Sequence, residues 1–210
     1  LYEEADFFWA ETATVECISE TFAKNSIGEY PEIKSLVNFI KLITCARQDV
    51  PLANVLLEFF NFNEEELAII RERGDEFSSF YDCAEKVRQN YNDELSTKLK
   101  NFFEYLNKIR IICEFATAGE VLHRIISDTD YDTKIIASGL GEVKMRRIER
   151  FISASCEGGG NMSIREFSEN LEETLKDISV SEASGDNTVK IMTMHASKGL
   201  EFPFVIIAGA

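Results

Sequence analysis

Several features that would place a protein in a common class are missing from these 210 residues. No run of 18 apolar residues occurs, so we expect no transmembrane helix and no membrane partner. The acidic start, LYEEADFFWA, lacks the basic lead of a secretory signal. No initiator methionine precedes Leu1, and we therefore expect a fragment or a processed chain.

Cysteine and histidine are too sparse and too scattered to suggest a metal site. The chain has five cysteines and two histidines, and no two cysteines lie closer together than Cys17 and Cys45. This spacing excludes a CxxC motif, and the odd number argues against a complete disulfide framework. We expect no metal ligands and interpret the cysteines as free thiols in a reducing compartment.

Positive charge is also scarce. The chain has 22 lysines and arginines against 37 acidic residues, which gives a formal net charge of −15. A protein that binds nucleic acid by itself normally presents a basic face. The composition therefore argues against strong autonomous DNA binding, although it allows a small local contact inside a larger assembly.

The phosphate loop GxxxxGK[ST] is absent, and no acid pair suited to Mg²⁺ follows a predicted strand. The segment GLGEVK at residues 139–144 contains only GxG and follows no predicted strand, so we interpret it as the start of a helix. Phosphoryl transfer depends on a phosphate cradle and a metal ion. We expect this chain alone to bind neither ATP nor Mg²⁺ and to be inactive as an ATPase.

Helical periodicity dominates the first 180 residues, with 45% of the chain hydrophobic. Proline at a first turn, an Asn63–Glu66 cap and a Ser163–Glu166 capping box mark several helix starts. Residues 1–25 resemble one further amphipathic helix. The other helices are predicted at residues 31–43, 49–60, 63–74, 93–118, 141–155 and 163–178. The predicted fold class is mainly α.

The pattern changes near the end of the chain. VKIMTM (residues 189–194) and FVIIA (residues 204–208) are rich in β-branched and apolar residues, as strands are. Only a short segment separates them, so we predict a parallel pair, a small α/β element beside the helical bulk. Two strands do not form a stable sheet alone. Further strands would come from outside this chain, or the pair would pack on the helices.

The loop between these two segments carries the polar groups that we select as candidates: Thr193, His195, Ser197, Lys198, Gly199 and Glu201. The carboxyl end of a strand is where open α/β sheets bind ligands. Gly199 permits close backbone approach, Lys198 offers a point charge for phosphate, and Glu201 can accept from a sugar hydroxyl. Each residue taken singly is also typical of an ordinary turn.

As a string, VKIMTMHASKGLEFPFVIIAG resembles motif V of the superfamily 1A DNA helicases, the UvrD/Rep/PcrA group. EIKSLVNFIKLI resembles their motif IV region, and RQDVPLANVLLEFFNFNEEELAIIR resembles the entry to their inserted helical subdomain 2B. QDVPLANVL is especially similar to the A subunit of bacterial helicase–nucleases (AddA or RexA). Tyr30 stands where the simpler helicases have an arginine, and Ser35 replaces an aspartate, which puts a γ-phosphate contact there in doubt.

This resemblance implies that the chain is divided into four parts. Residues 1–48 would hold amino-terminal helices and the motif IV-like part of the core subdomain 2A. Residues 49–178 would form a helical 2B-like subdomain, residues 179–187 a linker, and residues 188–210 the motif V strand–loop–strand of 2A. We expect Glu201, Lys198 and Gly199 to contact nucleotide, and Thr193, His195 and Ser197 to contact DNA.

The implied function is that of a fragment of the A subunit of an ATP-dependent helicase/nuclease, which unwinds and processes DNA ends in double-strand break repair. The intact enzyme would use ATP and Mg²⁺, act on single- and double-stranded DNA in the bacterial cytoplasm at the nucleoid, and pair with a B subunit. Two alternatives stay open. One is a non-catalytic helical interaction module, which the acidic charge favours, and the other is a simple UvrD-like helicase without a nuclease.

Overall fold

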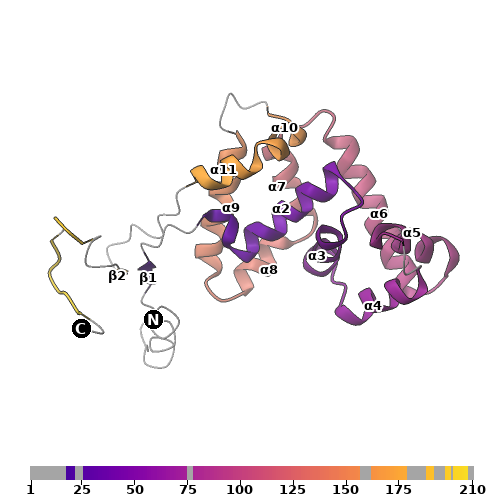
Figure 1. The fold of residues 1–210 in the computed structure, drawn as a ribbon, viewed down its shortest axis with the longest axis horizontal. Helices are drawn as coiled ribbons and strands as arrows, with labels where there is room; N and C mark the ends of the chain where they lie inside the picture. The colour runs from indigo at the N-terminus through magenta and orange to yellow at the C-terminus, as the bar shows by residue number, and fades with distance from the viewer. Residues whose placement is uncertain are drawn as a thin grey trace. The chain divides into compact units, whose positions relative to one another are not determined.

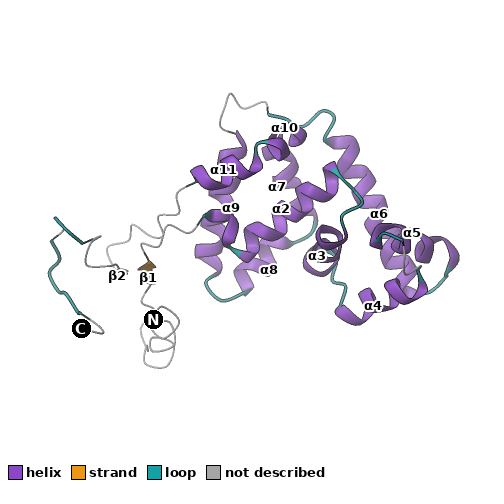
Figure 2. Ribbon diagram, viewed as in Figure 1, coloured by secondary structure: helices purple, strands orange, loops and turns teal. Residues whose placement is uncertain are grey.

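The computed structural model describes residues 18–21, 26–74, 78–156, 162–178, 188–191, 197–199 and 201–207. The described part is mainly helical, as predicted (Figures 1 and 2). None of the described helices is both long and apolar enough to cross a membrane. The helical elements are η1 (Ile27–Glu29), α2 (Pro31–Thr44), α3 (Asp49–Phe59), α4 (Glu64–Arg73), α5 (Phe80–Asn90), α6 (Glu94–Ile112), α7 (Ala118–Asp128), α8 (Tyr131–Ala137), α9 (Gly141–Cys156), α10 (Ile164–Glu169) and α11 (Leu171–Asp177).

Two compact units make up the chain. Unit 1 combines Leu1–Asn25 with Val180–Ala210, and unit 2 is Ser26–Ser179. The division that we expected between residues 48 and 49 does not coincide with this border, because α2 packs against α3, α9 and α10 within unit 2. Whether the two units correspond to subdomains 2A and 2B stays a prediction.

Helix α2 is central to unit 2 because most of its surface is apolar. Pro31 occupies its first turn, where a missing N–H costs nothing. At its carboxyl end, the Arg110 guanidinium donates to the carbonyl oxygens of Leu42 at 2.9 Å and Ile43 at 3.3 Å. These bonds satisfy acceptors that a helix end leaves without partners. The helical periodicity of residues 31–43 predicts one apolar stripe, and the structure confirms that all of it is buried: Ile33, Leu36, Val37, Ile40 and Ile43.

Local capping explains where several helices begin. The predicted Asn63–Glu66 cap at α4 and the Ser163–Glu166 capping box at α10 are confirmed. Two further capping boxes were not predicted: Asp93 with Ser96 at the start of α6, and Thr117 with Glu120 at the start of α7. Hydrogen bonds from the backbone N–H groups of Thr117 and Ser163 lower the pKa of the Glu120 and Glu166 carboxyls, respectively. Each carboxylate therefore stabilises the helix start that it caps.

Two predicted helices are shorter than the periodicity suggested. The helix expected over residues 93–118 ends as α6 at Ile112, because a turn follows and Thr117 caps a new helix, α7. The helix expected over residues 163–178 is divided at Asn170 into α10 and α11. An apolar stripe shows which side of a helix faces the core, and that side can continue across a short break in the helix. The stripe alone therefore does not reveal where one helix ends and the next begins.

Unit 1 contains a parallel strand pair, β1 (Ile18–Thr21) with β2 (Thr188–Ile191), in which Ile18 pairs with Thr188 and Thr21 with Ile191. The strand predicted from residue 189 is therefore confirmed over the described part of its length. The helix predicted over residues 1–25 is wrong for Ile18–Thr21. The predicted pairing with residues 204–208 is also wrong where residues are described, because residues 204–207 form no strand. The hydrogen bonds that define β1 come from a segment far along the chain, and no local pattern reveals them.

Candidate functional site

The candidate loop begins beyond β2, and the structure describes part of it. Residues 197–199 form a turn, with Ser197 half-buried and Lys198 and Gly199 exposed. Glu201 is exposed as well. Two of the candidates, Thr193 and His195, lie outside the described residues. The structure therefore places four of the six candidates on one short accessible segment.

Gly199 gives this turn its backbone geometry. Its φ is +87°, in the left-handed region where a side chain would be strained. A Cβ built on Gly199 would meet no atom of the described residues within 4 Å, so the backbone conformation, rather than crowding by those residues, accounts for glycine here.

Lys198 and Glu201 supply opposite charges on this segment, and both side chains are accessible to solvent. An ammonium group attracts phosphate, and a carboxylate accepts from a hydroxyl group such as those of ribose. The turn therefore fits parts of a nucleotide. Among the described residues, no group of three or more His, Cys, Asp or Glu side chains could hold a metal ion.

The four apolar residues that follow Pro203 are strongly exposed. Phe204 is 92%, Val205 70%, Ile206 86% and Ile207 67% accessible. Contiguous apolar surface of this kind is unusual on a folded protein. An uninterrupted apolar run of this kind is typical of a strand covered on both faces, and within the described residues this segment lacks that cover.

A second polar cluster lies in unit 2, at the motif IV-like turn that begins α2. The Arg147 guanidinium on α9 approaches the Glu32 carboxylate to 2.8 Å and lies 3.6 Å from the centre of the Tyr30 ring. The two charged side chains are 2% and 11% exposed, for Glu32 and Arg147 respectively. Tyr131 donates to the Glu32 carbonyl oxygen at 3.2 Å. A buried cation thus stands over the tyrosine that replaces the expected arginine.

Arg147 was not among the predicted site residues. The available signal was weak: an acidic residue beside the buried stripe of α2, and two consecutive arginines in a helix more than a hundred residues later. Neither feature identifies the other, because the contact depends on how α2 and α9 pack. The structure alone pairs them.

Two features indicate the class of this protein. One is a parallel strand followed by an exposed charged turn, and the other is the motif V-like string that contains both. The chain belongs to the family of UvrD-like helicase C-terminal domains, which matches residues 20–210. The resemblance to superfamily 1A helicases is therefore confirmed for nearly the whole chain.

The chain is also similar to individual proteins of this family that share one name. The chain is 33% identical over 217 residues to the A subunit of the ATP-dependent helicase/nuclease of Oceanobacillus iheyensis, covering 96% of this chain and 17% of that protein. It is 32% identical over 197 residues to the protein of that name in Alkaliphilus oremlandii, covering 89% of this chain and 16% of the relative. It is 34% identical over 188 residues to the protein of that name in Lactobacillus johnsonii, covering 85% of this chain and 15% of the relative. The chain thus spans about a sixth of the length of these relatives.

Proposed function

We propose that this chain is part of the A subunit of an ATP-dependent helicase/nuclease, a motor that unwinds DNA and processes DNA ends in double-strand break repair. The observation that carries the proposal is the accessible turn at residues 197–199, within a string that resembles motif V. The family match and the names of the relatives support it. The intact enzyme would use ATP and Mg²⁺, bind single- and double-stranded DNA in the bacterial cytoplasm, and pair with a B subunit.

In this proposal each part of the loop has its own partner. Glu201 accepts a hydrogen bond from a nucleotide ribose, and Gly199 lets the backbone come close to the nucleotide. Lys198 neutralises phosphate on the nucleotide or on DNA. Thr193, His195 and Ser197 contact the DNA backbone. Because unit 1 contains both β2 and this loop, nucleotide and DNA would meet the same short segment.

Glu201→Ala in the full-length enzyme is expected to raise the KM for ATP about 10- to 100-fold, because a hydrogen bond to a charged acceptor contributes about 1.5–3 kcal/mol. Steady-state ATP hydrolysis with saturating single-stranded DNA measures this change. The variant is also expected to lose the preference of the enzyme for ATP over 2′,3′-dideoxy-ATP, which lacks the ribose hydroxyls. Glu104→Ala, on the exposed face of α6, is the matched control. An unchanged KM and unchanged unwinding would remove the role of Glu201.

The isolated 210-residue chain is expected to show no ATP hydrolysis above background, because it has no phosphate loop and its described part has no metal cluster. A coupled assay with ATP, Mg²⁺ and single-stranded DNA tests this. Turnover that co-purifies with the chain and responds to Glu201→Ala would show that this chain holds more of the catalytic apparatus than proposed.

A non-catalytic interaction role is the second candidate, and the net charge of −15 favours it. Such a module would dock on a partner and would need neither ATP nor the charged turn. It would therefore tolerate Glu201→Ala and Lys198→Ala without loss, whereas the motor would not. A simple UvrD-like helicase is distinguished by measuring nuclease activity in the full-length protein.

A further inference from the structure

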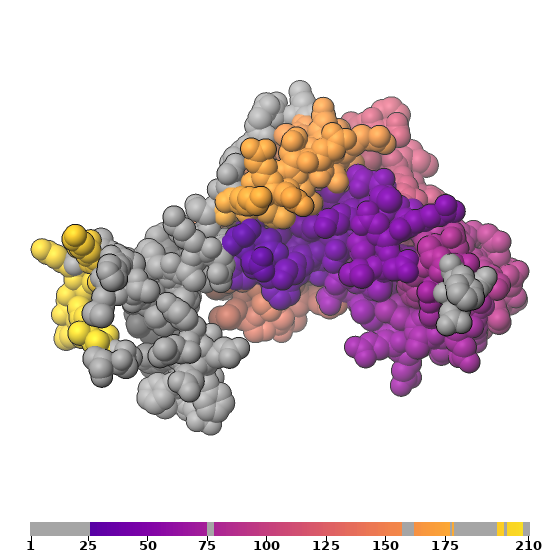
Figure 3. All heavy atoms as spheres, viewed as in Figure 1, coloured from indigo at the N-terminus to yellow at the C-terminus, as the bar shows by residue number. Residues whose placement is uncertain are grey.

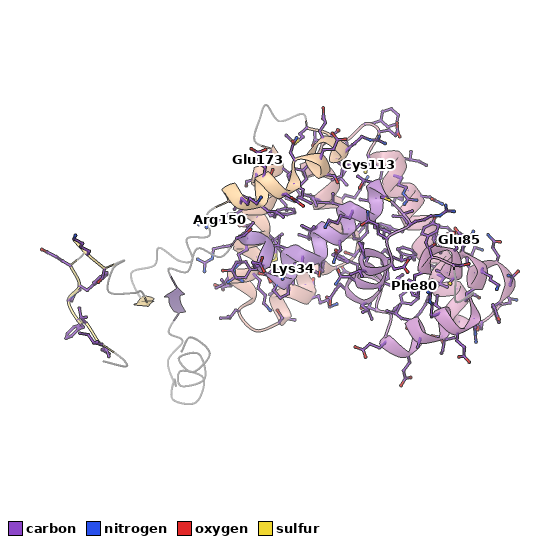
Figure 4. The ribbon with its side chains drawn as sticks, viewed as in Figure 1. Lys34, Phe80, Glu85, Cys113, Arg150 and Glu173 are labelled. Carbon is purple, nitrogen blue, oxygen red and sulfur yellow. The ribbon has the colours of Figure 1, made fainter. Side chains whose placement is uncertain are left out.

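Two apolar side chains are exposed on unit 2 at the corner between α6 and α7. Phe115 is 90% exposed, more than any other large apolar side chain among the described residues of this unit, and Ile111 is 64% exposed. Residues four positions apart share one face of a helix, so these two side chains form one apolar surface. Cys113 marks the corner in Figure 4, and Figure 3 shows the end of α6 at the edge of the unit.

The backbone of this corner is fixed by hydrogen bonds. The Phe115 N–H donates to the Ile112 carbonyl oxygen at 3.0 Å, which continues the coil of α6 past its last residue. Before the corner, the Arg110 guanidinium ties α6 to α2. After the corner, the Ala118 N–H donates to the Met162 carbonyl oxygen at 2.8 Å. The Phe115 ring is therefore presented to solvent from a fixed backbone.

A ring in this position adds little to the stability of unit 2, because an apolar side chain stabilises a fold only when it is removed from water. The arrangement suits a binding surface. Aromatic side chains on a fixed backbone are common anchors of interfaces, since little conformational freedom is lost when a partner covers them. Glu114, exposed between the two apolar side chains, forms no ion pair with any described residue. A matching pocket is therefore apolar, with a basic residue at its rim.

The small size of this surface favours a partner in the same polypeptide. A phenylalanine side chain buries about 150–250 Å², so the two side chains together bury a few hundred at most. A stable interface between separate proteins buries about 800 Å² on each partner. A tethered segment needs less contact, because the tether already raises its effective concentration. The chain spans about a sixth of the length of its relatives, so a subunit of that size has many other segments.

We propose that Phe115 and Ile111 form a docking site for another segment of the same subunit, which supplies an apolar pocket with a basic residue at its rim. Phe115 fills the pocket, Ile111 packs on its wall, and Glu114 pairs with the basic residue. The proposal rests on one part of the proposed function, namely that this chain belongs to a longer A subunit. It requires neither ATP nor DNA.

The test is photo-cross-linking of the full-length A subunit, purified alone, with the substitution Phe115→p-benzoylphenylalanine. Irradiation is expected to join position 115 to a segment of the same polypeptide outside these 210 residues, with a yield that does not depend on protein concentration. Peptide mapping identifies the segment. The same amino acid at Asn101, an exposed position earlier on α6, is the control and is expected to give no cross-link to that segment. A cross-link that forms only between polypeptides, only after a second subunit or DNA is added, or not at all would overturn the proposal.

A charge reversal at the rim gives a second measurement. Added to the photo-reactive variant, Glu114→Lys is expected to lower the yield of the internal cross-link at least about fivefold, because it places like charges opposite each other. Asn101→Lys adds a lysine elsewhere on α6 and is expected to leave the yield unchanged. An unchanged yield with Glu114→Lys would refute the basic rim. A full-length protein that hydrolyses no ATP and unwinds no DNA would refute the proposed function, while the cross-link would still decide the docking site.

Discussion

Glu32→Ala is expected to lower the free energy of unfolding of unit 2 by about 3–5 kcal/mol, because it leaves the Arg147 guanidinium buried without its carboxylate. The pair is 2.8 Å apart and nearly inaccessible to solvent on both sides. Arg147→Met is expected to cost a similar amount, since it isolates the Glu32 carboxylate and removes the cation from the Tyr30 ring. Urea unfolding of the 210-residue chain, followed by circular dichroism, measures both.

Two controls separate charge burial from a general effect of mutation. The double variant Glu32→Met/Arg147→Met is expected to recover most of the loss, because removal of both partners leaves no uncompensated charge. Lys34→Met breaks the Glu29–Lys34 pair, whose side chains are 69% and 56% exposed. It is expected to change the free energy of unfolding by less than about 1 kcal/mol. A Glu32→Ala effect as small as that of Lys34→Met would show that the buried pair contributes little.

Phe39→Ala is expected to destabilise unit 2 by about 3–5 kcal/mol, because it empties a ring-sized volume in the core. Phe39 is fully buried on α2 and meets Phe59 edge-on, with ring centroids 5.0 Å apart. The rings of Phe60 and Tyr105 lie 6.4 Å and 6.5 Å away. The substitution therefore removes contacts from α3 and α6 as well as from α2. The urea midpoint is expected to fall without a change of slope.

The matched control is Phe115→Ala, which removes the same side chain from a position that is 90% exposed. It is expected to change the free energy of unfolding by less than about 0.5 kcal/mol. Phe39→Leu, which keeps most of the volume, is expected to fall between the two. Equal effects of Phe39→Ala and Phe115→Ala would contradict the central position of α2.

Local signals in the sequence determined much of the helical part of the fold. The stripes of α2 and α3 and the cap of Asn63 could be predicted because a helix places every third or fourth residue on one face and leaves its first N–H groups free. The break at Asn170 could not, since the apolar stripe continues through it. The motif V-like string likewise marked the candidate turn, and Gly199 has the left-handed backbone that allows close approach.

The sequence by itself thus predicted the starts of α2, α3, α4, α6, α9 and α10 and the family to which the charged turn belongs, but not α5, α7 or α8. Only the tertiary structure decided that Ile18–Thr21 is a strand, that α2 belongs with the helical unit, and that Arg147 meets Glu32. The physical reason is the distance along the sequence over which each kind of interaction acts. Caps and stripes depend on neighbours within one helical turn, whereas strand partners, buried ion pairs and the contact of Ser26 with Leu175 join residues more than a hundred positions apart.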